Sequence, residues 1–281
     1  MTLQQPNLMD KAHFQAYCID FSGYGGLPPG ITVSHTFVAS PSHNWNCFGT
    51  GKEATAGAKV LPSGAGSAYE QWASNIYGPY EGRGNDCPAA GLHVTYDGVC
   101  HNAANRILVL ADADVSDATG NALVMLMYGK YGFNIPQYIQ AVKDAAQKVN
   151  ADARTTIIPQ DEVDGVVARI TGDVAGEIDT LEKDILRSHF EERLKLQNLS
   201  PDQASRLRQI YSDFQAQRLV IFNATEAHNP NHSTNIQAQY ATAMKPVLSQ
   251  CLEQMLQTLG ETQFLALFQA SPEQAISFLL G

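Results

Sequence analysis

The fold of the N-terminal half is predicted from one stretch, residues 97–108, with the sequence DGVCHNAANRIL. A turn at Asp97-Gly98 follows a short β-like run at 92–96, and a helix is predicted from Cys100 to about Ala111. The backbone N–H groups and the positive dipole at the start of a helix favour a thiolate, which is the reactive form of cysteine. Cys100 is therefore a candidate nucleophile, although a small buried hydrophobic residue is the plainer interpretation of a lone cysteine.

Length and charge restrict the classes of function. The 281 residues suffice for one large or two modest domains. The formal net charge of −10 disfavours nucleic acids and anionic membranes as partners. The longest apolar runs, 107–111 and 122–128, are too short to cross a bilayer, and the first residues do not resemble a signal peptide. The sequence therefore predicts a cytoplasmic protein without a membrane span.

The cysteines form an odd, scattered set of five without a close pair. They stand at positions 18, 47, 87, 100 and 251. Without an export signal, reduced thiols are the expected state, and the lack of a CxxC pair gives no support to a structural zinc site. We expect neither a metal nor a cofactor.

Composition changes near residue 132. Residues 1–132 contain most of the glycine, both tryptophans and four of the five cysteines, whereas helical periodicity dominates residues 133–281. We predict an α+β domain over 1–132, followed by an all-α helical domain over 133–281.

The second domain is predicted to consist of helices whose apolar stripes form its core. A capping box at Ser200-Pro201 begins one of them, and Gly260 ends another. The predicted helices span about 135–149, 160–197, 201–228, 234–259, 261–269 and 272–280. Core packing accounts for these stripes. A protein partner or self-association through this domain is the functional alternative.

The first domain is predicted to contain a β-hairpin. Residues 31–39 alternate in polarity and are rich in β-branched side chains, a turn follows at 41–44, and 45–48 form the return strand. The long segment 49–91, with a short helix near 68–76, is typical of a loop that covers a functional site. Asp112 to Asp117 is interpreted as a solvated turn, because the glycine and the glutamate of a calcium loop are both missing.

A cysteine nucleophile needs a base, and four histidines of the first domain are candidates. His35 is preferred because it lies in the middle of a rigid strand. His101 is adjacent to Cys100, and neighbouring helical side chains diverge by about 100°, so His101 is not expected to reach the sulfur. His93 and His43 remain alternatives as base or orienting group. The third group of the site is predicted to be Asn46, with Asn44 or His43 as alternatives, because a hairpin would bring them within reach of His35.

A histidine on an early strand, a hairpin return and a cysteine that opens a helix resemble the circularly permuted branch of the papain-like NlpC/P60 superfamily. That branch includes the lecithin:retinol-acyltransferase-like proteins, and the resemblance covers residues 31–110. It implies a papain-like domain with Cys100, His35 and a polar third residue, Asn46 or His43, as catalytic residues. It also implies a hydrolase, a thiol protease or an acyltransferase that acts on a peptide or on a small acyl or amide substrate.

Three other interpretations remain open. Cys47 could be the nucleophile with His93 as base, although the glycines that follow Cys47 disfavour the helix such a site needs. A metal site could be formed by His35, His43, Cys47 and His93. Finally, the chain could be a non-enzymatic helical adaptor in which Cys100 is buried and structural.

Overall fold

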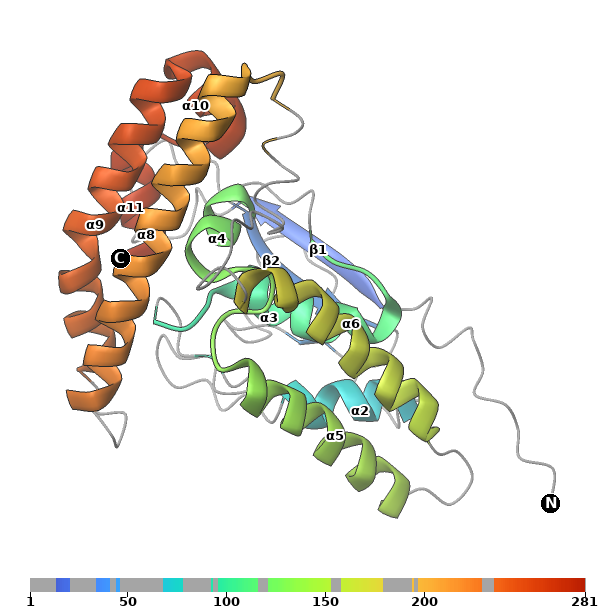
Figure 1. The fold of residues 1–281 in the computed structure, drawn as a ribbon. Helices are drawn as coiled ribbons and strands as arrows, with labels where there is room; N and C mark the ends of the chain where they lie inside the picture. The colour runs from blue at the N-terminus through green and yellow to red at the C-terminus, as the bar shows by residue number, and fades with distance from the viewer. Residues whose placement is uncertain are drawn as a thin grey trace. The chain divides into compact units, whose positions relative to one another are not determined.

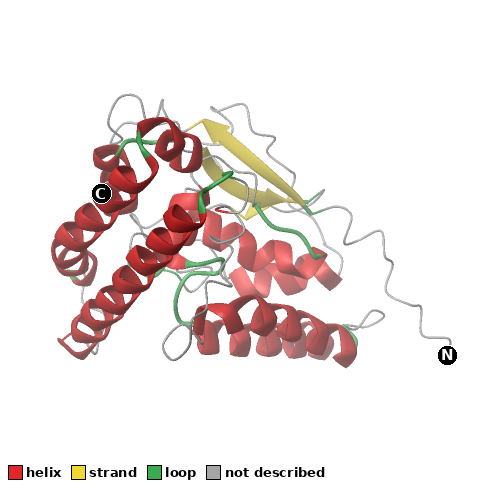
Figure 2. Ribbon diagram, turned by 45° about the horizontal axis from the view of Figure 1, so that its top comes forward, coloured by secondary structure: helices red, strands yellow, loops and turns green. Residues whose placement is uncertain are grey.

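A computed structural model gives the fold of the chain (Figure 1). It describes residues 14–20, 34–40, 44–45, 68–77, 92, 96–115, 121–152, 158–178, 194, 197–228 and 235–280. The described part is predominantly helical (Figure 2). Contacts divide the chain into two compact units. Unit 1 comprises residues 1–19, 35–118 and 130–173, and unit 2 comprises the remainder.

The β structure of the described residues consists of three short strands in the order β1-β2-β3. They are β1 (Gln15–Asp20), β2 (Ser34–Ala39) and β3 (Asn44–Trp45). β2 and β3 are antiparallel, with Val38 opposite Trp45 and Ala39 opposite Asn44. The antiparallel pairing agrees with the predicted hairpin, but Asn44, which was predicted to lie in the turn, is the first residue of β3. Residues 31–33, 41–43 and 46–48 of the prediction lie outside the described residues.

The helices of unit 1 are α2 (Ala68–Tyr77), α3 (Cys100–Leu108), the 3₁₀ helix η4 (Val109–Ala111), α5 (Ile135–Asp152) and the part of α6 (Gln160–Ile178) that ends at residue 173. α2 packs against α5 and contacts α3. Trp72 of α2 is fully buried, and its Nε1 donates a hydrogen bond to the carbonyl oxygen of Val142 at 2.9 Å. This bond fixes α2 on α5 while the indole fills the space between them.

Unit 2 contains α4 (Asn121–Tyr128), α8 (Pro201–His228), α9 (Ile236–Leu259), α10 (Glu261–Phe268) and α11 (Pro272–Leu280). α8 and α9 pack along each other, and α10 and α11 pack on α9 and α4 (Figure 1). All eight residues of α4 are buried, and the Tyr128 hydroxyl donates to the Leu279 carbonyl oxygen at 2.8 Å. The predicted all-α character of the C-terminal half agrees with these helices.

Two helix ends follow from local sequence signals. The Ser200 N–H donates to Gln203 Oε1 at 3.0 Å, and the Gln203 N–H donates to Ser200 Oγ at 3.2 Å. This reciprocal capping box begins α8 where it was predicted. At the end of α9, Gly260 has a φ of +75°, a conformation that favours glycine.

The predicted boundary at residue 132 falls inside the 130–173 segment of unit 1. α5 and most of α6 therefore belong with the N-terminal elements, and α4 belongs with the C-terminal helices. Of the long helix predicted over 160–197, the structure shows residues 160–178 as α6 and places residue 197 in a bend, and residues 179–193, 195 and 196 lie outside the described residues. Among the helices the structure describes, none is long and apolar enough to cross a membrane.

Gly172 offers a test of the local helix energetics in α6. It is exposed, and a Cβ at this position would meet no atom within 4 Å. We expect Gly172→Ala to raise the free energy of unfolding by about 0.5–1 kcal/mol, because alanine loses less backbone entropy in a helix. Urea unfolding followed by circular dichroism measures the change, and a variant less stable than the parent chain would contradict it.

Candidate functional site

Cys100 is the first residue of α3, and the preceding Val99 has an extended backbone with φ −138° and ψ −176°. Asn102, the third residue of the helix, accepts a hydrogen bond from the Val99 N–H on its Oδ1 at 2.9 Å. This contact is one half of a capping box, and it fixes the helix start directly before Cys100. The predicted position of Cys100 at the beginning of a helix is confirmed.

The imidazole that the structure places beside Cys100 belongs to His101. Cys100 Sγ lies 3.5 Å from His101 Nδ1, within hydrogen-bond distance for sulfur. Cys100 is half-buried and His101 is fully buried. Which atom donates depends on the tautomer: a neutral Nδ1 accepts from the thiol, and an imidazolium donates to a thiolate.

The expectation that His101 does not reach the sulfur was wrong, for a geometric reason. An angle of about 100° separates the directions of adjacent side chains on a helix, but it does not fix how far apart their atoms lie. Sγ is one bond from Cβ, and Nδ1 is two bonds from Cβ. Two such short side chains meet across neighbouring Cα atoms when their rotamers turn toward each other.

Three buried polar side chains of α3 bind the segment 130–134, which we call the 130–134 loop. Asn102 and Asn105 both donate to the Lys130 carbonyl oxygen, at 3.2 and 2.9 Å. Arg106 donates from Nε to the Tyr131 carbonyl oxygen at 2.7 Å and from Nη2 to that of Phe133 at 2.6 Å. Each of the three side chains is at most 1% exposed. They share one face of α3, because residues three and four apart are neighbours on a helix.

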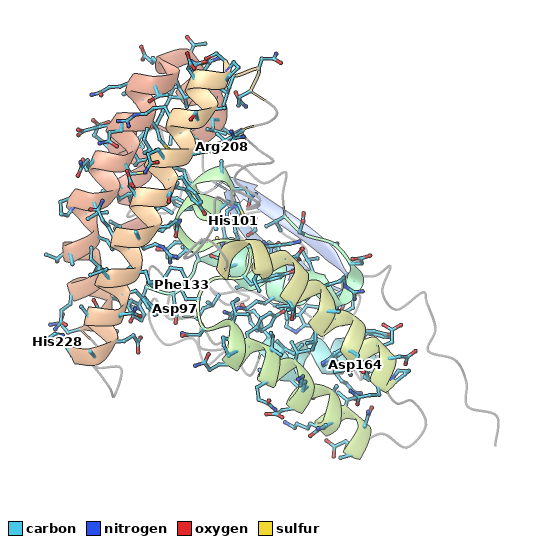
Figure 3. The ribbon with its side chains drawn as sticks, in the orientation of Figure 1. Asp97, His101, Phe133, Asp164, Arg208 and His228 are labelled. Carbon is cyan, nitrogen blue, oxygen red and sulfur yellow. The ribbon has the colours of Figure 1, made fainter. Side chains whose placement is uncertain are left out.

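The turn before Cys100 is held by the same loop (Figure 3). The Asp97 carbonyl oxygen accepts from the Phe133 N–H at 2.7 Å, and Asn134 Nδ2 donates to Asp97 Oδ2 at 3.1 Å. Gly132 has a φ of +75°, and a Cβ on it would lie 2.4 Å from the Asp97 carbonyl oxygen. The close approach of loop and turn therefore requires glycine at position 132, and it positions the start of α3.

Sequence reasoning missed this clamp of α3 on the 130–134 loop. The available signal was the set of three large polar residues at positions 102, 105 and 106, which share one face of a short helix. Such a pattern indicates buried polar groups that need partners. It does not identify the partners, because they are main-chain carbonyls about 25 residues further along the chain.

The other predicted site residues are placed as follows. His35 lies in β2, is 2% exposed, and stacks against Phe37 with ring centroids 6.1 Å apart. Asn44 forms part of β3, opposite Ala39. Asn46, His43, Cys47 and His93 lie outside the described residues. Within the described ranges, no group of three or more histidine, cysteine or acidic side chains could hold a metal ion.

Cys251 in α9 provides a contrast with Cys100. It is 4% exposed, and burial raises the pKa of its thiol well above the ordinary value. A raised pKa leaves little thiolate at neutral pH, so Cys251 is a structural residue of the unit 2 core.

Comparison with protein families, with curated proteins and with solved structures finds no match for this chain.

Proposed function

We propose that this protein is a thiol enzyme in which Cys100 attacks the carbonyl carbon of an amide, a thioester or an ester. The observation that carries the proposal is the distance of 3.5 Å between Cys100 Sγ and His101 Nδ1 at the first residue of α3. A cysteine at a helix start with an imidazole beside it has both features that favour the thiolate. The half-buried position of Cys100 leaves part of its side chain accessible to a substrate.

The proposed reaction forms an acyl thioester in two steps, and an acceptor then takes the acyl group. His101 accepts the thiol proton while Sγ bonds to the carbonyl carbon, and the backbone N–H of Cys100 donates to the resulting oxyanion. The intermediate then collapses to an acyl thioester, and the imidazolium returns its proton to the departing amine, thiol or alcohol. Water as acceptor makes the protein a hydrolase or thiol protease, and an amine or hydroxyl acceptor makes it an acyltransferase.

A papain-like site is a more specific form of the same proposal, with a different base. In that version His35 is the base and Asn46 orients it, and Cys100 keeps its role as nucleophile. His101 would then lie beside the thiolate as a second imidazole. Single substitutions of the two histidines distinguish the versions, because only the base is needed for turnover.

We expect Cys100→Ala to remove the fast labelling of the protein by iodoacetamide at pH 7 and all hydrolysis of p-nitrophenyl acetate above the uncatalysed rate. Peptide mapping by mass spectrometry gives the labelling rate of each cysteine separately. His101→Ala should lower turnover by about 10²-fold or more, the usual contribution of a general base. The matched control is Cys251→Ala, which removes a buried thiol and should leave labelling of Cys100 unchanged.

Two results would change the assignment. If Cys100 in the folded chain reacts no faster than Cys251, the enzymatic proposal fails, and a helical adaptor with a structural Cys100 replaces it. If His35→Ala abolishes turnover while His101→Ala retains it, Cys100 remains the nucleophile and the papain-like version is correct.

A further inference from the structure

A cavity of about 330 Å³ opens in unit 1 at the end of α3 that lies away from Cys100. Val109, which lines the cavity, comes nine residues after Cys100. Because a helix rises about 1.5 Å per residue, the cavity and Cys100 are about 13 Å apart along the helix axis. The cavity is therefore separate from the proposed thiol site. Its polar wall is formed by Asp112, Asp114, Lys130, Tyr131, Arg169 and Asp173.

One side of the wall is internally paired. Lys130 Nζ lies 3.2 Å from Asp114 Oδ2 and 3.0 Å from Asp173 Oδ2, and the Tyr131 hydroxyl donates to Asp173 Oδ2 at 2.5 Å. Burial and the bond to Asp173 raise the pKa of Tyr131, so its hydroxyl remains a donor. The ammonium group thus lies between two carboxylates.

The other side of the wall holds an incompletely bonded pair. Arg169 Nη2 donates to the Val109 carbonyl oxygen at 3.3 Å, and Nε lies 3.6 Å from Asp112 Oδ1, too far for a normal hydrogen bond. Nε is buried without a hydrogen-bond partner among the described residues. The Asp112 side chain is 77% exposed, and the backbone of Asp112 is in the left-handed region, with a φ of 57°. Because Nε is buried, a ligand in the cavity would meet the terminal Nη1 and Nη2 of Arg169 together with the accessible carboxylate of Asp112.

We propose that this cavity binds a small zwitterion of the amino-acid class, with its carboxylate on Arg169 and its ammonium group on Asp112. A guanidinium fork fits a carboxylate with two parallel hydrogen bonds, which a point charge does not match. The volume lies at the small end of the range for ligand cavities and suits a molecule of this size.

The charge of the wall argues against other ligands. Two cations and three carboxylates give a formal charge of −1 (2 − 3). A phosphate or other dianion would meet the three carboxylates, and no group of described residues could hold a metal ion. A zwitterion satisfies the guanidinium and the accessible carboxylate together without adding net charge.

Isothermal titration of the full chain with each of the standard amino acids tests the proposal, with acetate, methylammonium and inorganic phosphate as separate probes. We expect at least one amino acid to bind more tightly than acetate or methylammonium alone. Arg169→Gln should weaken that binding about 10- to 100-fold, because it removes charge-assisted hydrogen bonds. Asp112→Asn should weaken the binding of the zwitterion, because it removes the partner of the ammonium group. It should strengthen the binding of acetate, because it removes a carboxylate that repels the anion.

Asp164→Asn is the matched control, because Asp164 is an exposed aspartate of the same helix as Arg169 and does not line the cavity. The Asp164→Asn variant should bind the amino acid with the same affinity as the parent chain. Asp112 is exposed, so its variant tests the site even if Arg169→Gln impairs folding. The proposal is overturned if no amino acid binds at about 10 mM, if phosphate binds more tightly than every amino acid, or if Asp112→Asn leaves both affinities unchanged.

Discussion

Replacing Arg106 by leucine should lower the free energy of unfolding of unit 1 by about 3–5 kcal/mol. The side chain is 1% exposed, and it donates to the carbonyl oxygens of Tyr131 and Phe133. Its guanidinium also lies 4.6 Å from the ring centroid of Tyr138. Leucine fills part of the volume but leaves both carbonyl oxygens buried without these donors, and each such group costs about 1–3 kcal/mol.

Two variants of matched chemistry make this expectation specific. Arg106→Lys keeps the positive charge but lacks the planar fork that reaches two carbonyls, so it should be less destabilising than Arg106→Leu. Arg206→Leu makes the same change at an exposed position of α8 and should alter stability by no more than about 0.5 kcal/mol. Urea unfolding measures all three. Equal stabilities of the Arg106→Leu and Arg206→Leu variants would show that the clamp of α3 on the 130–134 loop contributes nothing.

Gly132→Ala should destabilise unit 1 by about 3 kcal/mol or more. The left-handed backbone at φ +75° costs alanine about 1–2 kcal/mol. Its Cβ would lie 2.4 Å from the Asp97 carbonyl oxygen, a main-chain atom that cannot rotate away. The loop must therefore move, and the hydrogen bond from the Phe133 N–H to Asp97 is lost.

Gly260→Ala is the comparison variant, because it has a positive φ without the clash that Gly132→Ala makes with Asp97. Gly260 has the same φ of +75°, but nothing lies within 4 Å of the position of its Cβ. Gly132→Ala should be the more damaging change, because only at position 132 does the added Cβ meet a main-chain atom. Because Asp97 begins the turn before Cys100, Gly132→Ala should also alter the iodoacetamide labelling rate of Cys100, whereas Gly260→Ala should not. Identical losses of stability would mean that the contact with Asp97 is unimportant.

Local signals predicted the helices well. The capping box at Ser200 marked the start of α8, and Gly260 marked the end of α9, because both features act within one turn of the chain. The helix after Cys100 was also predicted, including its extension to Ala111, which the structure forms as η4. The apolar run of α4, residues 122–128, is too short to show periodicity, so the sequence does not distinguish a buried helix from a strand there.

The polar contacts were beyond the reach of sequence reasoning. Asp112 was interpreted as part of a solvated turn, and its side chain is 77% exposed in a turn, but nothing in the sequence indicated that it lies beside Arg169, a residue 57 positions later (169 − 112). His101 was rejected from an average helical angle, although rotamers determine whether two adjacent side chains touch. Long-range partners and rotamers depend on the packed structure, and neither leaves a periodic pattern in the sequence.

The membership of α4 in unit 2 bears on how this protein can be divided for experiments. A fragment that starts after residue 132 would lack the buried helix on which α10 and α11 pack, together with the tyrosine hydroxyl that holds the Leu279 carbonyl. Its C-terminal helices would expose an apolar surface, which favours aggregation. Expression of the last helices alone is thus a poor route to a soluble binding module, and fusions or deletions should retain residues 121–128.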